Sequence, residues 1–222
     1  MTDPSVAFAQ YNARILLGQP LSSKYITHYI ESLTILLTRP TSPNGPHVAT
    51  YRDSVYFNYR HLGLSLLFTP QKGYQLIKGT PAEDLDQSRL FLDGIDFYNV
   101  TLQSPPSSPP APSKPPFSPT AADHGFRSYP VTPIKIHFSG EADDSLQVQR
   151  SSTGKYFVEH LGEPDRKGGG AGPSNGSIGI WCEWTKKGIM VEFGGNEARG
   201  PDAWNTGKDA KWKVISMFPI PK

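Results

Sequence analysis

The alternation of apolar and polar positions in the first half of the chain predicts helices followed by antiparallel strands. Residues 23–37 repeat apolar side chains at intervals of four and three, the spacing of one helix face, and Ser22 is available as the N-cap. Residues 54–60 and 62–68 alternate with a period of two, which predicts two strands. A tight hairpin turn is expected between them, at Gly63. Similar patterns predict a short helix over 7–17 and strands over 73–78 and 90–101.

The second half of the chain repeats this order. Thr153 is expected to cap a helix that ends at Leu161, because Gly162 permits a left-handed turn and Pro164 blocks extension. Phe157, Val158 and Leu161 would lie on the inner side of this helix. Strands are expected over 131–138, 178–184, 189–193 and 211–218. In each half a helix would therefore cover the inner face of a sheet, which is an α+β arrangement.

An internal repeat relates the two halves. Residues 54–68 align with residues 179–193 at a constant offset of 125 without a gap, so that Gly63 falls on Gly188. Self-similarity of this kind indicates two related supersecondary units. We therefore expect an α+β fold of two similar helix-plus-antiparallel-sheet repeats, whose sheets lie side by side or are fused. The repeats would occupy residues 1–103 and 120–222, with residues 104–119 between them.

The second of these units resembles a known one. A helix that ends at Gly162-Glu163-Pro164 is followed by a strand with Trp181 and Trp184 and by a glycine-started strand that ends in Phe193. This order is similar to the unit shared by the β-lactamase-inhibitor protein and the small outer-membrane-assembly lipoproteins of bacteria, and the inhibitor carries the unit twice. The resemblance covers residues 22–100 and 150–218, and it implies a binding scaffold rather than a catalyst. The sequence has neither the lipoprotein signal nor a disulfide-forming pair, and no functional residue is carried over.

Residues 104–119 differ from both halves in composition. Thirteen of these sixteen residues are Pro or Ser. Such a segment has too few apolar groups to form a core, so we expect an extended, disordered linker or surface loop. The PxxP pattern begins at Pro106, Pro109 and Pro112. This pattern makes the segment a candidate ligand for a proline-reading domain.

Charge and cysteine content narrow the function classes. The chain has 22 Lys and Arg against 20 Asp and Glu, a net charge of +2, and neither half has the single-sign field that favours nucleic acid or an anionic membrane surface. No apolar stretch approaches the roughly 18 residues of a membrane-spanning helix. The single cysteine, Cys182, excludes an internal disulfide and fits a reducing compartment. We expect a soluble intracellular protein without nucleic-acid or membrane partners, cytoplasmic in location, with a nuclear location equally compatible.

No motif in the sequence predicts a metal or cofactor site. The six histidines have no spacing to one another, or to Cys182, that is typical of metal ligands. Cys182 lies on the apolar face of a predicted strand and aligns with Phe57, so a buried thiol is favoured over a nucleophile. Glu183 and Lys186 are three residues apart, and a strand would not place both on one side. A nuclease-type pair of acid and lysine is therefore not expected.

Two aromatic-rich surfaces are the candidate binding sites. In the loop 194–212, Trp204 lies among charged and amide side chains, a composition typical of a protein-binding hot spot or of a sugar-stacking platform. The alternative is that Trp204 folds back over the sheet edge. In the first half, the outward positions of the strand 54–60 carry polar and aromatic side chains. The candidate binding residues are Arg199, Asp202, Trp204, Asn205 and Lys208 in the loop, and Tyr56, Asn58 and Arg60 on the strand.

These observations predict a non-enzymatic protein-binding, assembly or adaptor module. The alternative is a hydrolase-type enzyme in which Asp165, Glu183 and Glu192 converge with a histidine in the cleft between the repeats. The two hypotheses predict different surfaces. A buried carboxylate facing a histidine in a concave pocket would favour the enzyme. A flat sheet face with exposed Trp and Tyr side chains would favour binding.

Overall fold

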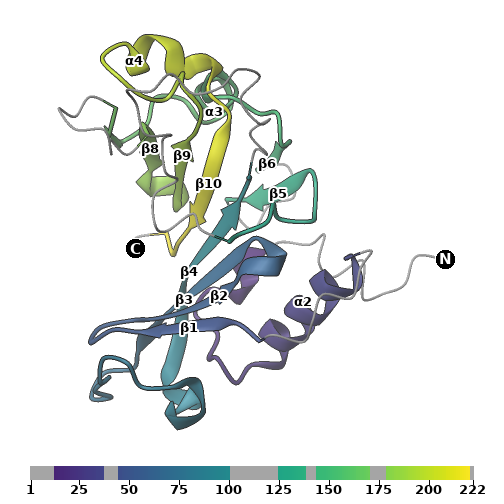
Figure 1. Cartoon of the computed structure of the whole chain (residues 1–222), viewed down its shortest axis with the longest axis vertical. Coiled ribbons are helices and arrows are strands. Elements are labelled where there is room, and N and C mark those ends of the chain that lie inside the picture. Colours follow the sequence, from purple (N-terminus) through teal and green to yellow (C-terminus); the bar gives the residue numbers. More distant parts are fainter. Residues whose placement is uncertain (1–12, 38–44, 101–124, 139–143, 171–178, 221–222) are drawn as a thin grey trace, which may run out of the picture.

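The fold is built on one eight-stranded antiparallel sheet with the strand order β1-β2-β3-β4-β10-β9-β8-β7. The computed structural model describes residues 13–37, 45–100, 125–138, 144–170 and 179–220 (Figure 1). The strands are β1 (His47–Thr50), β2 (Val55–Tyr59), β3 (Leu64–Pro70), β4 (Leu90–Tyr98), β7 (Arg166–Gly168), β8 (Trp181–Trp184), β9 (Ile189–Phe193) and β10 (Trp212–Met217). The mixed α+β class is confirmed. The sheets of the two halves are fused, because β4 pairs with β10.

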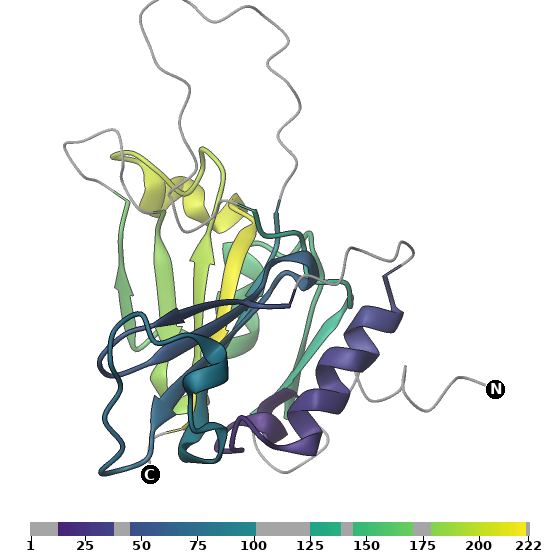
Figure 2. The same ribbon diagram turned by 60° about the horizontal axis from the view of Figure 1, so that its bottom comes forward.

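The helices and a small second sheet pack on one face of this large sheet. They are η1 (Ala13–Leu16), α2 (Lys24–Ile35), α3 (Gly154–Leu161) and the hairpin of β5 (Ile134–His137) and β6 (Ser145–Val148). In Figures 1 and 2, α2 accompanies the β1–β4 half and α3 accompanies the β8–β10 half. Short turns complete the fold: η2 (Arg60–Leu62), η3 (Ala82–Asp84), η4 (Gln87–Arg89), η6 (Thr185–Lys187), α4 (Ala203–Thr206) and η7 (Gly207–Asp209). Within the described residues, no helix is long and apolar enough to cross a bilayer.

The two longer helices follow the predicted pattern with small differences. The α2 helix begins after Ser23, not Ser22, and the Ser23 hydroxyl accepts a hydrogen bond from the Tyr25 amide at 3.3 Å. In α3, Phe157 is fully buried and its ring packs against Phe193, with 5.8 Å between ring centroids. Val158 was expected on the inner side but is 37% exposed. Successive residues are about 100° apart around a helix, so Phe157 takes the inward position and Val158 turns away.

Other predicted elements have different bounds. Within the expected helix 7–17, the structure describes only a 3₁₀ turn over Ala13–Leu16. No strand forms over 73–78, because Gly73 and Gly79 adopt positive φ angles and bend the chain at both ends. The expected loop 194–212 contains α4 and η7. The proline-rich residues 104–119 lie outside the described residues, so the linker and the proline-reading partner stay predictions.

The two hairpin turns of the sheet have the same backbone form. In each, a 3₁₀ turn ends at a left-handed glycine: Gly63 has φ 59° and ψ 38°, and Gly188 has φ 59° and ψ 43°. The glycine carbonyls also have equivalent roles. The Gly63 carbonyl accepts a hydrogen bond from the Tyr98 amide at 2.9 Å, and the Gly188 carbonyl accepts one from the Phe218 amide at 3.0 Å. These turns fix where β3 and β9 begin.

Replacing Gly63 by alanine tests how closely the first turn is packed. Gly63→Ala is expected to lower the free energy of unfolding by about 2–3 kcal/mol, because a left-handed alanine is strained and its Cβ would overlap the backbone of Arg127 and Tyr129. The control is Gly79→Ala, which also has a positive φ but faces open space, so only about 1 kcal/mol should be lost. Urea unfolding measures both. Equal losses would show that the close packing of Gly63 against residues 127–129 does not contribute to the loss in unfolding free energy.

Candidate binding surfaces

The face of the sheet opposite α2 and α3, here called the open face, carries a row of aligned side chains. Cross-strand pairing places Asn58 opposite Ser65, Ser65 opposite Asp96, and Asp96 opposite Ser216. These residues alternate with buried core positions such as Ile95, so they lie on the opposite face. The complete row, here called the polar row, has one residue from each strand, and all are polar except Met190. They are His47, Asn58, Ser65, Asp96, Ser216, Met190, Glu183 and Arg166.

Neighbours in the polar row bind one another. The Ser65 hydroxyl donates to Asn58 Oδ1 at 2.9 Å, and the Ser216 hydroxyl donates to Asp96 Oδ1 at 2.7 Å. At the β7 edge, Arg166 forms an ion pair with Glu183 at 3.2 Å. In the second half of the open face, the charges of Arg166 and Glu183 thus neutralise each other. Lys213 and Glu192, on β10 and β9, add a further ion pair at 3.1 Å.

The first half of the open face is hollowed into a cavity of about 490 Å³, here called the basin. Asn58, Ser65 and Asp96 of the polar row form its floor. Tyr56 precedes Asn58 by two residues and Tyr98 follows Asp96 by two, so the two tyrosines lie on opposite sides of the row. The remaining lining residues are His47, Ala49, Tyr51, Asp53, Ser54, Arg60 and Phe126.

Aromatic pairs form the two sides of the basin. The Tyr51 and Tyr56 rings meet edge to face, with 5.9 Å between their centroids. On the other side, the Tyr98 and Phe126 rings stack at 3.8 Å. Such contacts hold each ring in a fixed orientation. The basin therefore has ordered aromatic sides and a polar floor.

Asp96 is the charged group at the floor of the basin. Its pKa is raised to about 6, mainly by burial; the hydrogen bond from Ser216 opposes this rise, and the neighbouring Glu192 adds a smaller contribution to it. Glu192 in turn forms an ion pair with Lys213. Among the ion pairs of the described residues, none includes Asp96. The carboxylate thus faces the basin with a hydroxyl partner and without a counter-ion among the described residues.

The three strand residues predicted to bind, Tyr56, Asn58 and Arg60, all line the basin. The alternation in β2 places Tyr56 and Asn58 opposite the buried Val55 and Phe57, as expected. Sequence reasoning missed the contributions of β3 and β4 to the same site. The local alternation of Ile95, Asp96 and Phe97 would have put Asp96 on the outward side. Only the strand register, which the sequence does not supply, places it next to Ser65 and in line with Asn58.

The five predicted loop residues are divided by the structure. Trp204, on α4, is 45% exposed, and with Lys208 it lines a second cavity of about 290 Å³, here called the Trp204 pocket. Arg199 is half-buried, Asp202 and Asn205 are exposed, and these three do not line the pocket. The other lining residues are Gly154, Lys155, Val158, Glu159, Glu163, Pro164, Lys167, Ile180, Cys182, Phe193 and Gly207.

The Trp204 pocket and the basin lie on opposite faces of the sheet. The pocket is lined by Ile180, Cys182 and Phe193, whose side chains alternate with those of the open face. Trp204 partly covers this end of the sheet, and nearly half of its surface is exposed to solvent. Its position is therefore intermediate between the two alternatives, an exposed binding residue and a tryptophan folded back over the sheet edge. The Lys167 ammonium lies 5.5 Å from the centre of the Trp204 ring, a cation–π contact. Five of the eight predicted residues therefore line two separate surfaces, and Arg199, Asp202 and Asn205 line neither.

Cys182 is a core residue. Its side chain is 7% exposed, and burial raises the pKa of the thiol to about 11, although Lys167 lowers it and Glu163 raises it. A thiol with this pKa is protonated near neutral pH and is a poor nucleophile. This agrees with the interpretation of Cys182 as the counterpart of the buried Phe57.

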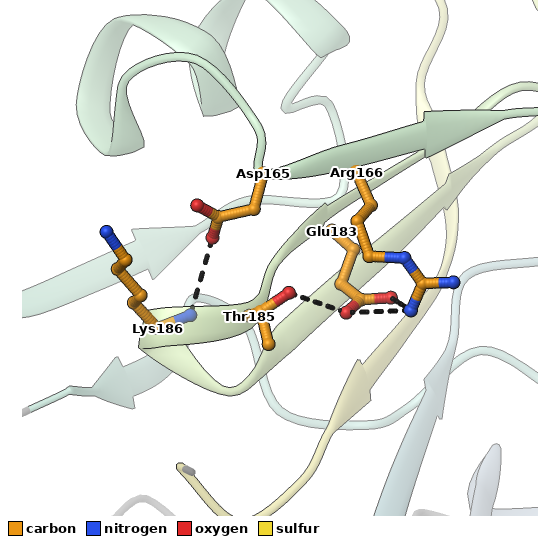
Figure 3. Close-up of polar contacts among 5 residues, drawn as sticks. All are labelled: Asp165, Arg166, Glu183, Thr185 and Lys186. Carbon is orange, nitrogen blue, oxygen red and sulfur yellow. Dashed lines mark hydrogen bonds and ion pairs between the residues drawn. The ribbon is translucent and has the colours of Figure 1, made fainter.

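The acidic residues of the hydrolase hypothesis are held by neighbouring groups (Figure 3). Glu183 accepts a hydrogen bond from the Thr185 hydroxyl at 2.7 Å and binds Arg166. Asp165 accepts one from the backbone amide of Lys186, which lies in the η6 turn, at 3.4 Å. Glu192 binds Lys213. These contacts are typical of structural ion pairs.

Among the described residues, no histidine of the open face lies near these acids. His47 is the histidine of the polar row, and it occupies β1, at the edge of the sheet opposite β7. Within the described part of the chain, no group of three or more His, Cys, Asp or Glu side chains is arranged to hold a metal ion. Within the described residues, none of the three acids of the hydrolase hypothesis is therefore paired with a histidine of this face.

Comparisons with known protein families, with curated proteins and with solved structures find no match for this chain. The resemblance to the inhibitor and lipoprotein unit therefore stays a prediction. The function must be inferred from the chemistry of the open face and of the Trp204 pocket.

Proposed function

We propose that the protein is a non-enzymatic binding module that docks a protein partner on the open face of its sheet. The observation that carries this proposal is the basin, where Tyr51, Tyr56 and Tyr98 surround a polar floor on the face not covered by α2 and α3. Tyrosine and arginine are enriched where proteins meet, because they combine contact area with hydrogen bonding. An aromatic rim around polar groups suits recognition better than it suits a buried core.

We further infer that the module consists of two copies of one helix-plus-sheet unit. Positions 125 residues apart lie equally far from the β4–β10 boundary: Asn58 and Glu183 are both two strands away from the boundary strand of their half, and Ser65 and Met190 are both one strand away. The matching turns at Gly63 and Gly188 add support. Duplication would give the module one continuous surface across eight strands.

The two halves would contribute differently to docking. In the second half, Arg166 with Glu183 and Lys213 with Glu192 already form ion pairs. The first half has the basin and an Asp96 carboxylate without a counter-ion in the described part of the chain. The basin is therefore the proposed centre of the interface, and the paired charges of β7–β10 form its polar rim.

Site-specific photocrosslinking tests which face docks the partner. A benzoylphenylalanine at Leu67, a partly exposed open-face position on β3, is expected to capture a partner in cell extracts. The same group at Val158, which lines the Trp204 pocket on the other face, should not capture it. The captured protein is then identified, purified and recombined with the full chain. Capture from Val158 alone would contradict the proposal.

Matched tyrosine variants then measure the contribution of the basin. Tyr51→Ala, at the rim of the basin, is expected to weaken binding of the purified partner about tenfold or more, the effect of losing an interface hot spot. Tyr25→Ala removes an equally exposed tyrosine from α2 and should change binding less than about twofold. Calorimetric titration measures both. A loss caused by Trp204→Ala but not by Tyr51→Ala would move the interface to the Trp204 pocket and overturn the proposal.

A further inference from the structure

We propose that the basin binds a positively charged side chain of the partner, a lysine or an arginine, with the Asp96 carboxylate as its counter-ion. This inference rests on the proposed function, since it specifies the chemistry of the group that enters the open face. It follows from three features of the basin: its aromatic sides, its carboxylate floor and the charges around it.

The aromatic sides provide favourable surfaces for a cation. A cation within about 6 Å of a ring centre is attracted by the negative face of the ring. Tyr51 and Tyr56 stand on one side of the polar row, and Tyr98 and Phe126 on the other. The Phe126 ring is 8% exposed and supports Tyr98 from behind, so the exposed aromatic surface on that side belongs mainly to Tyr98. A side chain that enters the basin lies between these two aromatic pairs.

The floor of the basin provides a negative charge, the Asp96 carboxylate, that has no counter-ion among the described residues. Asp96 accepts a hydrogen bond from the Ser216 hydroxyl at 2.7 Å, and the second carboxylate oxygen has no hydrogen bond within the described residues. Burial and Glu192 together raise the pKa of Asp96 to about 6, which shows that the ionised form is poorly stabilised. A cation beside Asp96 would remove this penalty. Hydrogen bonds between a carboxylate and an ammonium or guanidinium are also stronger than neutral ones.

Within the described residues, the other charged groups that line the basin form no ion pair with Asp96. Asp53 lies on the Tyr51 side, and together with Asp96 it raises the pKa of the Tyr56 hydroxyl, although burial is the larger cause. Arg60 lines the opposite end, where its side chain lies beside Gly125. Lys213 is held by Glu192 on the neighbouring strands. The basin thus combines two carboxylates with one guanidinium at its edge, and a volume within the range of ligand sites.

Titration with small probes tests the inference on the intact chain. The probes are Nα-acetyl-lysine methylamide and Nα-acetyl-arginine methylamide, followed by backbone amide NMR shifts. The control probe is Nα-acetyl-norleucine methylamide, which has an apolar side chain of similar length without the charge. We expect the cationic probes to shift amides of β2, β3 and β4 and to bind at least about fivefold more tightly than the norleucine probe. Equal binding of all three probes would overturn the inference.

Two aspartate variants separate the floor of the basin from the rest of its strand. Asp96→Asn keeps the acceptor for Ser216 but removes the charge, and it is expected to weaken binding of both cationic probes about tenfold. Asp93→Asn removes a charge from the same strand outside the basin and should leave binding within about twofold. Unchanged binding by Asp96→Asn, with an unchanged NMR spectrum elsewhere, would overturn the inference.

The same variants distinguish this inference from the proposed function. A partner that crosslinks to Leu67 and binds Asp96→Asn as tightly as the unmodified chain would leave the docking face in place and refute the cationic anchor. Probe binding that depends on Asp96, without any partner captured from Leu67, would support the cation site and contradict the protein-docking proposal. A partner whose binding falls about tenfold with Asp96→Asn would support both.

Discussion

Arg14→Met is expected to lower the free energy of unfolding by about 3–5 kcal/mol, because it removes one guanidinium that satisfies several distant backbone carbonyls. Arg14 Nε donates to the His137 carbonyl at 2.7 Å, Nη2 to the Lys187 carbonyl at 2.7 Å, and Nη1 to the Phe218 carbonyl at 3.2 Å. These carbonyls belong to β5, to the η6 turn and to the segment after β10. Arg14 therefore ties η1 to three parts of the fold.

The cost of this change comes mainly from the acceptors that remain. The carbonyls lie in partly buried surroundings, and a buried acceptor without a partner costs about 1–3 kcal/mol. Burial lowers the pKa of the Arg14 guanidinium, which still stays charged at neutral pH. Methionine retains the apolar stem and so keeps much of the packing against Phe138, whose ring lies 6.0 Å from the Arg14 guanidinium carbon. The loss would thus report the hydrogen bonds rather than a cavity.

Chemical denaturation followed by far-ultraviolet circular dichroism measures this effect. Arg52→Met is the control, since Arg52 is exposed in the segment between β1 and β2 and should change stability by less than about 0.5 kcal/mol. Arg14→Lys keeps the charge but lacks the guanidinium fork, and it should fall between the two. A loss below about 1 kcal/mol for Arg14→Met would show that water replaces the guanidinium at little cost.

The helices and most strands of this fold could be predicted because their signals are local. The spacing of Ile26 and Leu33 identifies the buried face of α2, and the alternation around Phe57 identifies β2. Arg14 could not be recognised in this way. Its acceptors lie 123 to 204 residues further along the chain, and they are backbone carbonyls, which leave no trace in residue identities.

Only part of the candidate site could be predicted, because local patterns identify some of its residues and long-range pairing brings in the others. Alternation in one strand places Tyr56 and Asn58 outward, but the basin also needs residues whose pairing partners are remote in the sequence. Ser216 lies 120 residues after Asp96, and the β4–β10 register brings them together. The composition of the loop 194–212 singled out Trp204. It could not show that α4 places this residue on the face opposite the basin.

Asp96→Asn is expected to stabilise the protein above about pH 6, by up to about 2–3 kcal/mol, because it removes a carboxylate whose ionisation the fold disfavours. In the folded chain the pKa of Asp96 is about 6, whereas an unfolded aspartate has a pKa near 4. Below about pH 4 the group is protonated in both states and contributes no difference. The amide side chain of this variant would also keep an oxygen acceptor for the Ser216 hydroxyl.

The sign of the pH dependence follows from the raised pKa. Between about pH 4 and 6 the unfolded chain loses the proton while the folded chain retains it, so rising pH destabilises the fold through this group. Above about pH 6 both states are ionised, and the full cost remains. The difference in unfolding free energy between Asp96→Asn and the unmodified chain should therefore grow from pH 4 to 6 and then stay constant. Glu192 and Tyr56 interact with the same carboxylate and are unchanged in this comparison.

Urea unfolding at several pH values measures this difference, with Asp93→Asn as the control on the same strand. A difference that does not change between pH 4 and 7 would show that Asp96 titrates as it does in the unfolded chain. The expected result connects stability with binding, because a cation in the basin favours the ionised carboxylate and should offset part of the cost. A carboxylate that destabilises the empty fold and is compensated by a ligand is typical of a group retained for recognition. Stabilisation by Asp96→Asn, together with weaker binding of the cationic probes, would establish that role.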